Sequence, residues 1–392
     1  MLGITKLLCG ITTPSDDLRY GGDSSRLPTE PLSPKEKRPI VVWNMTRRCN
    51  LRCIHCYSES KDEDYIGELT TEEGKGLIED ISYFKVPTIL FSGGEPFMRK
   101  DLFELASFAI EKGIRGVIST NGTLITPPVA MKIREIGISY VGISLDGLEG
   151  TNDRFRGKKG AFEEALRGIR NCSDAGVKVG LRFTLNSYNY KDLPAVLDLL
   201  EKEDIPRCCV YHLVYSGRGS KLIKADISHE ETRHALDIIF DKTGYFYSKG
   251  ITKEILTVDN HANGVYLYLK IKKEQPERAE DVLRFLRWNG GASSGIGIGN
   301  VDNLGYVHAD QFWRHYSFGN VRERRFSEIW MDTSDPIMAG LKNRKGLLKG
   351  RCSRCKYLDI CNGNFRVRAE AVTGDVWESD PACYLTDEEI GI

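Results

Sequence analysis

The chain has 392 residues, enough for one large domain and a smaller one, and its 55 Lys and Arg balance 55 Asp and Glu. Zero net charge gives no electrostatic reason to expect a nucleic acid partner or an anionic membrane surface. No apolar run approaches the roughly 18 residues of a membrane-spanning helix, so we expect no membrane association.

Seven of the eleven cysteines fall in two tight groups, 49/53/56 and 352/355/361/383. No secretory signal precedes them, and such grouping is typical of metal ligation in a reducing compartment rather than of a disulfide framework. We therefore expect a cytoplasmic protein.

Residues 1–39 are rich in Pro, Gly and Ser, which predicts an irregular N-terminal arm with room for one short helix. Arg19 and Tyr20 of this arm are long enough to reach a site elsewhere, although packing on the surface is the more ordinary role. The rest of the chain divides into three predicted segments: 40–220, 221–290 and 291–392.

From residue 40, short apolar runs alternate with helical patterns. Strands are predicted at 40–45, 88–91, 116–120, 140–145, 177–185 and 208–214, and helices near 70–84, 101–112, 127–136, 161–175 and 192–202. Asp101 and Thr126 stand at helix starts, and Gly113 and Gly137 at helix ends. This alternation predicts a parallel sheet covered by helices, here a partial (β/α)6 barrel of the TIM type. Its chemistry is expected in the loops that follow the strands.

The two remaining segments have different patterns. Residues 221–290 are mostly polar and predict a helical bridge that packs on the barrel. Residues 291–300 are glycine-rich, and the Asn/Gly turn that follows predicts a β-hairpin in a small C-terminal α+β domain. A phosphate-binding loop is disfavoured, because no strand–turn–helix context surrounds these glycines.

Cys49, Cys53 and Cys56 follow the first predicted strand. A four-iron (4Fe-4S) cluster takes four ligands, so three thiolates leave one iron open to bind and react. His55 is available as a fourth ligand for a zinc site instead, since zinc requires four ligands. The position at a strand end, facing the mouth of a barrel, favours the open cluster.

The cysteine triad and the strand ends together resemble the radical S-adenosyl-L-methionine (SAM) superfamily. In that family the open iron is chelated by SAM, and residues 92–96 resemble the glycine-rich SAM motif. The resemblance places Arg182 against the SAM carboxylate and His55 near the adenine, although polar strand ends can also bind substrate. The implied SAM-binding residues are His55, Ser92, Gly93, Gly94, Glu95, Thr120, Asn121, Ser144, Asp146, Arg182 and Asn186.

Cys352, Cys355, Cys361 and Cys383 supply four thiolates, enough to saturate a second cluster. Four-cysteine zinc sites have similar spacings and remain the alternative. The segment resembles the C-terminal auxiliary-cluster (SPASM/Twitch) domain of radical SAM enzymes. Residues 291–320 contain no cysteine, so we predict the shortened, Twitch-like form with one auxiliary 4Fe-4S cluster, acting in electron transfer or in holding the substrate side.

Residues 44–51, 153–157, 308–315 and 384–389, with 3–10 and 15–21 of the arm, resemble the sirohaem-modifying branch of the superfamily. This implies an iron-tetrapyrrole substrate, and a ferredoxin or flavodoxin as electron donor. The implied reaction is loss of two acetate side chains from 12,18-didecarboxysirohaem to give Fe-coproporphyrin III. Removal of propionate side chains from the same substrate is the first alternative.

Two other classes of protein remain open. A peptide-modifying radical SAM enzyme would share both cysteine patterns, but the N-terminal arm is short for a peptide-binding domain. A non-enzymatic electron carrier would not need the 92–96 motif.

Arginines suit the carboxylates of such a substrate, aromatic side chains suit its face, and a histidine can ligate its iron. The predicted substrate residues are Arg154, Arg156, His212, Tyr215, Arg218, His308, Phe312, Trp313, Arg314 and His315.

Overall fold

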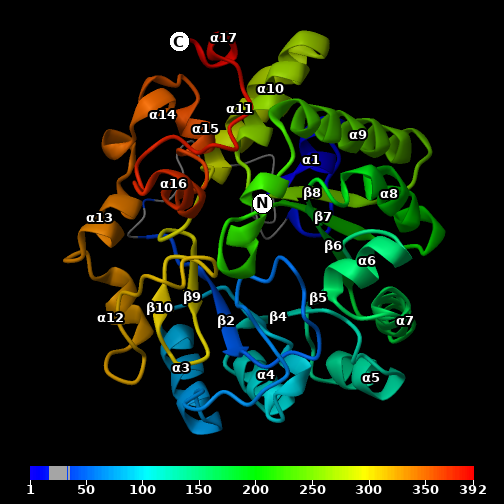
Figure 1. The fold of residues 1–392 in the computed structure, drawn as a ribbon, viewed down its shortest axis with the longest axis vertical. Helices are drawn as coiled ribbons and strands as arrows, with labels where there is room; N and C mark the ends of the chain where they lie inside the picture. Colours follow the sequence, from blue (N-terminus) through cyan, green and yellow to red (C-terminus); the bar gives the residue numbers. More distant parts are fainter. Residues whose placement is uncertain (17–32, 34–35) are drawn as a thin grey trace.

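The computed structural model describes residues 1–16, 33 and 36–392 (Figure 1). Arg19 and Tyr20, and most of the 15–21 segment used above, lie outside the described residues. No described helix is long and apolar enough to cross a membrane.

A ten-stranded sheet forms the centre of the molecule, in the order β1-β8-β7-β6-β5-β4-β3-β2-β9-β10. The six predicted strands are confirmed and pair in parallel with their neighbours. They are β2 (Ile40–Thr46), β3 (Thr88–Gly93), β4 (Arg115–Thr120), β5 (Tyr140–Ser144), β6 (Val179–Leu185) and β7 (Arg207–His212). Because all six run the same way, the loops after their carboxyl ends meet at one mouth.

Helices cover the outside of these strands, as Figure 1 shows. They are α3 (Thr71–Tyr83), α4 (Leu102–Glu111), α5 (Pro127–Glu135), α6 (Glu149–Arg156), α7 (Ala161–Asp174) and α8 (Leu193–Lys202). Thr70 and Glu73 form a capping box on α3. Asp101 precedes α4 but makes no cap hydrogen bond; its carboxylate instead accepts from Arg99 and Thr71. Asp101 therefore occupies the predicted start of α4 but does not cap the helix through its side chain.

The sheet extends beyond the predicted barrel at both edges. Residues predicted as a helical bridge contain β8 (Glu254–Val258), which pairs in parallel with β7. The N-terminal arm contributes β1 (Leu2–Gly3), antiparallel to β8, which was not predicted. It also contains α1 (Ile4–Cys9), in agreement with the short helix for which the sequence left room. At the other edge, β9 (Ile298–Val301) pairs in parallel with β2.

The rest of the predicted bridge is helical, with α9 (His229–Ser248), α10 (Ala262–Glu274) and α11 (Ala279–Asn289). The predicted hairpin is confirmed, because β10 (Val307–His308) pairs antiparallel with β9. The C-terminal segment contains α12 (Phe326–Met331), α13 (Pro336–Lys342), α14 (Gly350–Arg354), α15 (Leu358–Cys361), α16 (Arg366–Thr373) and α17 (Asp387–Ile390). α15 contacts both α10 and α11, so the C-terminal segment packs on the bridge.

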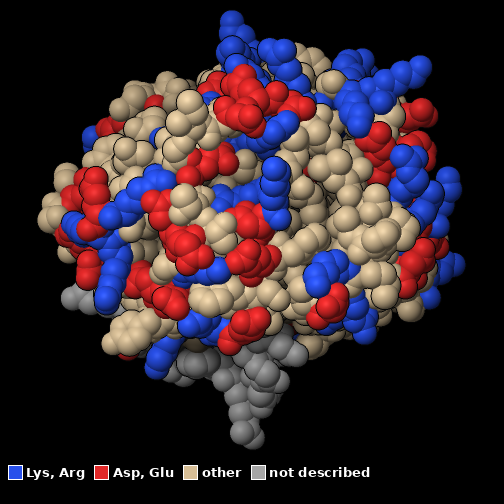
Figure 2. All heavy atoms as spheres, turned by 90° about the horizontal axis from the view of Figure 1, so that it is seen from below, with Lys and Arg blue, Asp and Glu red and all other residues tan. Residues whose placement is uncertain are grey.

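Basic and acidic side chains are intermixed over the face in Figure 2. This mixture agrees with the zero net charge of the chain and gives this face no extended field of one sign.

Candidate functional site

A cavity of about 330 Å³ lies at the carboxyl ends of the parallel strands. Its lining includes all three cysteines of the first group and the glycine-rich turn after β3. The predicted SAM residues that line it are His55, Ser92, Gly93, Gly94, Thr120, Asn121, Ser144 and Arg182. Residues from five different segments of the barrel therefore meet around one space.

The cysteine loop is held by polar contacts to its sulfurs. An Arg156 guanidinium nitrogen lies 3.4 Å from the Cys53 sulfur, and the Asn121 amide nitrogen lies 3.9 Å from that of Cys49. Burial raises the pKa of Cys49, and the neighbouring charges of Glu95, Cys53 and Cys56 raise it further. Burial likewise raises the pKa of Cys53, whereas for Cys56 the effect of burial is outweighed and the hydrogen bond with Ser58 and the charge of Arg218 lower its pKa. An iron centre is positively charged and stabilises the thiolates that it binds.

Gly94 brings the turn after β3 against the cysteine loop. A Cβ at Gly94 would lie 2.2 Å from the Arg48 carbonyl oxygen, and one at Gly93 would lie 2.2 Å from that of Thr46. The backbone nitrogen of Gly94 donates to the Thr46 oxygen at 2.7 Å. Only residues without a side chain allow this approach, and Gly93 also has a φ of 138°.

Glu95 lies behind the cavity wall instead of lining it. Its buried carboxylate accepts from the Thr120 hydroxyl at 2.7 Å and from the Asn121 backbone nitrogen at 2.8 Å. Burial raises the pKa of Glu95 to about 7, against the opposing effect of these hydrogen bonds. Glu95 thus positions two residues of the wall.

Asp146 links two other wall residues. It forms an ion pair with Arg156, and its carboxylate lies 3.5 Å from His55 Nε2. Burial lowers the pKa of His55 to about 4, although Asp146 acts against this shift. His55 is therefore neutral at physiological pH, and its ring stacks at a tilt on Phe155 with centroids 4.6 Å apart.

Arg182 on β6 crosses the neighbouring strand to reach the Ser119 hydroxyl on β4. Gly142 on β5 makes room for it, since a Cβ there would lie 2.2 Å from Arg182 Nε. A glycine inside a strand commonly marks such a close approach. Asn186, by contrast, is buried in a turn, where it bonds to Thr184 and Tyr188, and it does not appear among the described cavity residues.

Buried polar atoms without a partner show that the cavity suits a polar ligand. Among the described residues, Arg182 Nε, Arg218 Nη2 and His55 Nδ1 are buried and make no hydrogen bond. All three side chains line the cavity. Because an unpaired buried donor costs about 1–3 kcal/mol, such groups point to a bound partner that satisfies them. The donor set fits a cluster on the three cysteines and an anionic, polar cofactor beside it.

A family model described as the radical SAM superfamily matches residues 43–200. The whole chain is 64% identical to the Fe-coproporphyrin III synthase of Methanosarcina barkeri, covering 99% of that protein. It is 44% identical to the pre-heme d1 synthase of Dinoroseobacter shibae, over 93% of this chain and 91% of that protein. The chain belongs to the radical SAM superfamily.

Solved structures agree on the fold. Streptococcus suis SuiB bound to S-adenosylmethionine matches with a TM-score of 0.70 at 18% identity, covering 89% of this chain and 78% of that one. The anSMEcpe enzyme with bound AdoMet and Cp18Cys peptide matches with a TM-score of 0.67, over 88% and 94%. These likenesses confirm the predicted fold with its C-terminal segment. Membership of the radical SAM superfamily implies a 4Fe-4S cluster and SAM as cofactors.

The predicted substrate residues fall into two groups in this radical SAM fold. Arg156, His212, Arg218 and Phe312 line the cavity. Arg156 contacts Asp146 and the Cys53 sulfur, and Arg218 donates to the carbonyl oxygens of Cys53 and Ser60. These two arginines hold the cysteine loop, whereas the sequence offered them only as substrate contacts.

The other predicted substrate residues lie outside the described cavity lining: Arg154, Tyr215, His308, Trp313, Arg314 and His315. Arg154 is exposed on α6. Trp313 donates to Glu370, and exposed His315 lies 3.1 Å from the same carboxylate. The Tyr215 hydroxyl donates to Asp226. His308 is buried, with Nδ1 2.8 Å from the Tyr316 oxygen.

The four cysteines of the second group gather beside α15. Burial raises the pKa of Cys361 well above its usual value, and the nearby Cys383, Cys352 and Cys355 raise it further. In the described part of the chain, no three His, Cys, Asp or Glu side chains are grouped as ligands of one metal ion.

Sequence reasoning missed part of the cavity wall. Asp259 and His261 follow β8, and Ser294 and Asp310 come from the segment around the hairpin. Because β8 was not predicted, nothing placed its carboxyl end at the mouth. The available sequence signal was the pair Asp259-Asn260, because Asp and Asn favour turns. In the structure Asp259 has a φ of 65°, a left-handed conformation that aspartate tolerates better than most residues.

Proposed function

We propose that this chain is a radical SAM enzyme of haem biosynthesis that converts 12,18-didecarboxysirohaem to Fe-coproporphyrin III by removing two acetate side chains. The 64% identity along the whole chain to a protein named Fe-coproporphyrin III synthase carries the proposal. The cavity supports it, because cationic side chains and Phe312 line the space beside the cysteine triad.

In this proposal the cofactors supply the radical chemistry, and the side chains of the protein bind and orient them. A reduced 4Fe-4S cluster with bound SAM supplies a 5′-deoxyadenosyl radical that abstracts hydrogen from the substrate. The chain's own residues bind and orient: Cys49, Cys53 and Cys56 hold the cluster, and Arg182 with its free Nε pairs with the SAM carboxylate. Neutral His55 offers its unpaired Nδ1 to the adenine.

Gly142→Ala tests the role of Arg182. The new methyl group would lie 2.2 Å from Arg182 Nε and displace the guanidinium. We expect SAM affinity to fall about 10- to 150-fold, because one charge-assisted hydrogen bond of roughly 1.5–3 kcal/mol is lost. Equilibrium dialysis with the cluster-loaded enzyme measures it. Gly150→Ala is the control, because no atom lies within 4 Å of a Cβ there. Equal SAM affinity in both variants would contradict the role.

The second cysteine group is proposed to hold one auxiliary 4Fe-4S cluster. With four thiolates it has no open iron for SAM, so its proposed work is electron transfer from the substrate side. The external reductant is proposed to be a ferredoxin or flavodoxin.

Cys383→Ser tests the auxiliary cluster. We expect the iron content after anaerobic reconstitution to fall from about eight to about four per chain, because two four-iron clusters become one. Cleavage of SAM should persist in this variant, since the triad is untouched. Cys172→Ser, at a buried cysteine of α7, should keep all the iron. A wild-type content of about four irons would remove the auxiliary cluster from the proposal.

The reaction itself is tested by incubating the enzyme anaerobically with didecarboxysirohaem, dithionite and SAM. We expect Fe-coproporphyrin III and 5′-deoxyadenosine, identified by mass spectrometry. The 44% identity to pre-heme d1 synthase supports the main alternative, and loss of propionate groups would favour it. If no tetrapyrrole is altered while SAM is cleaved, the substrate class is wrong and a peptide substrate becomes the candidate.

A further inference from the structure

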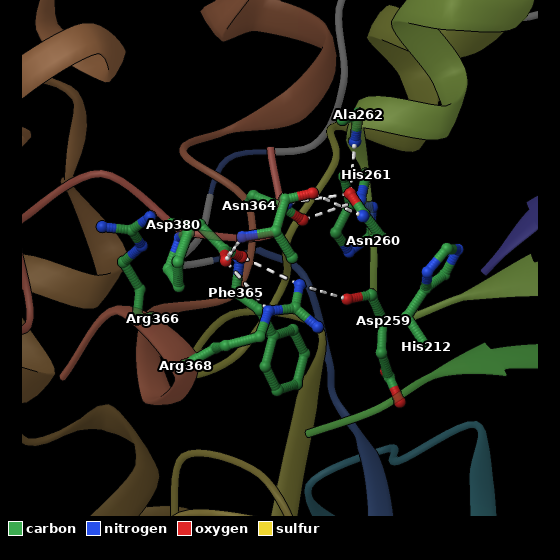
Figure 3. Close-up of polar contacts among 12 residues, drawn as sticks. His212, Asp259, Asn260, His261, Ala262, Asn364, Phe365, Arg366, Arg368 and Asp380 are labelled. Atoms are coloured by element: carbon green, nitrogen blue, oxygen red, sulfur yellow. Dashed lines mark hydrogen bonds and ion pairs between the residues drawn. The ribbon is translucent and has the colours of Figure 1, made fainter. Parts of the chain in front are cut away.

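The cavity has a second group of polar side chains, at the carboxyl ends of β7 and β8. His212 ends β7, and Asp259 and His261 follow β8. Figure 3 shows these residues beside the C-terminal segment that contains Asn364 and Phe365. They are separate from the SAM-binding residues proposed above, so they are available to the substrate.

One ring nitrogen of His212 already takes part in a hydrogen bond within the protein. The Tyr384 hydroxyl donates to Asn263 Oδ1 at 2.9 Å, and Asn263 Nδ2 lies 2.9 Å from His212 Nε2. An amide nitrogen only donates, so Nε2 accepts and the proton of the neutral ring resides on Nδ1. In this tautomer His212 offers the cavity a hydrogen-bond donor and no lone pair.

His261 has both ring nitrogens free. It lines the cavity, and neither nitrogen has a hydrogen-bond or ion-pair partner among the described residues. Its backbone is fixed, because its nitrogen donates to Asn364 Oδ1 at 2.7 Å, and Asn364 in turn donates to Asn260.

The surroundings of His261 keep its ring neutral. Burial lowers its pKa well below the usual value, and the N-terminal amino group, Arg344 and Arg368 lower it further. A neutral imidazole is the form that binds metals, and it suits iron.

We propose that His261 coordinates the iron of the bound iron tetrapyrrole through a ring nitrogen. The inference rests on the proposed function for its substrate class. The step forms one coordinate bond from a lone pair and moves no proton or electron, because the ring is already neutral. It replaces His308 and His315 as ligand candidates, since both lie outside the described cavity lining.

Two probes separate iron ligation from binding of the macrocycle: Fe(III)-coproporphyrin III and metal-free coproporphyrin III, titrated into the cluster-loaded enzyme. With wild type, the iron probe should give the Soret shift and electron paramagnetic resonance signal of a histidine-ligated haem. His261→Ala should lose that signature and bind the iron probe about tenfold more weakly, each tenfold being about 1.4 kcal/mol. Its affinity for the metal-free probe should stay unchanged, and added imidazole should restore the signature.

His315→Ala is the matched control and should behave as wild type, because His315 is exposed and pairs with Glu370. Equal weakening of both probes by His261→Ala would reduce His261 to a packing residue and overturn the inference. A signature lost in His212→Ala instead would overturn it as well. Failure of wild type to bind either probe would count against the proposed function. Binding with a spectroscopic signature that does not depend on His261 would contradict only the assignment of His261 as the iron ligand.

Discussion

Replacing Arg156 with methionine is expected to abolish most SAM cleavage, while the same change at Arg154 should have no effect. The two arginines lie two residues apart at the end of α6. Arg156 is buried between Asp146 and the Cys53 sulfur, whereas Arg154 is exposed. Contacts of this kind around metal ligands change metal affinity or activity by about 10–100-fold when they are removed.

The physical reason is charge. Without Arg156, the fully buried Asp146 carboxylate would face the cysteine thiolates with no cation between them. Leaving one member of a buried pair unpaired costs about 3–5 kcal/mol. We therefore expect Arg156→Met to lose iron from the triad and to form 5′-deoxyadenosine 10–100 times more slowly in the absence of substrate.

The assay needs no tetrapyrrole, which separates the two roles considered for Arg156. Uncoupled formation of 5′-deoxyadenosine, measured with dithionite and SAM alone, reports on the cluster loop. If Arg156→Met cleaves SAM as fast as wild type and loses only turnover of the tetrapyrrole, then Arg156 is a substrate contact, as the sequence suggested. Arg156→Lys keeps the positive charge but lacks the planar guanidinium. Its rate of 5′-deoxyadenosine formation should therefore lie between those of wild type and Arg156→Met.

The barrel could be predicted because its strands are continuous apolar runs separated by helical periodicity. β8 was missed for a physical reason. Its five residues lie between Lys253 and Asp259 in a polar region, and it becomes a strand by pairing with β7 on one side and β1 on the other. Such strand pairing depends on tertiary structure, so a five-residue strand gives only a weak signal in the sequence.

The candidate site, like the fold, could be predicted only in part from the sequence. Cysteine spacing and the glycine turn identified the residues near the cluster, because those groups follow strand ends in sequence. The substrate side was less predictable. Trp313 and His315 share Glu370, which lies more than fifty residues further along the chain, and this contact removes both from the described cavity lining. Contacts between distant segments decide which arginine or histidine faces a cavity.

The second large effect is expected at the buried ion pair of Arg368 and Asp380, both with fully buried side chains. The guanidinium makes a two-pronged contact with the carboxylate, with Nε and Nη2 each 2.9 Å from an oxygen. It also donates to the carbonyl oxygens of Leu213 at 2.9 Å and Asp259 at 2.7 Å. Figure 3 shows Arg368 between Asp380 and the end of β8.

The Arg368–Asp380 ion pair connects the segment that contains the second cysteine group to the wall of the cavity. Asp380 accepts from the backbone of Phe365, and its own carbonyl accepts from Cys383. Leu213 and Asp259 follow β7 and β8 directly. One side chain therefore fixes two strand ends of the barrel mouth relative to the segment that holds the second cysteine group.

Arg368→Met should lower the free energy of unfolding by about 3–5 kcal/mol, because it leaves a buried carboxylate without its cation. Asp380→Leu should cost a similar amount for the opposite charge. The double variant removes both charges and should be less destabilised than the sum of the two. Denaturant unfolding under anaerobic conditions measures all three, and Lys349→Met is the control, because Lys349 and Asp375 form an exposed pair in the same segment.

The same variants test whether the Arg368–Asp380 ion pair positions the wall of the cavity. If Arg368 fixes the ends of β7 and β8, Arg368→Met should weaken binding of coproporphyrin III with and without iron alike, since the whole wall shifts. That pattern differs from His261→Ala, which should affect the iron-bearing probe alone. An Arg368→Met protein with wild-type unfolding midpoint and unchanged affinity for both probes would mean that the ion pair neither stabilises the chain nor positions the cavity wall.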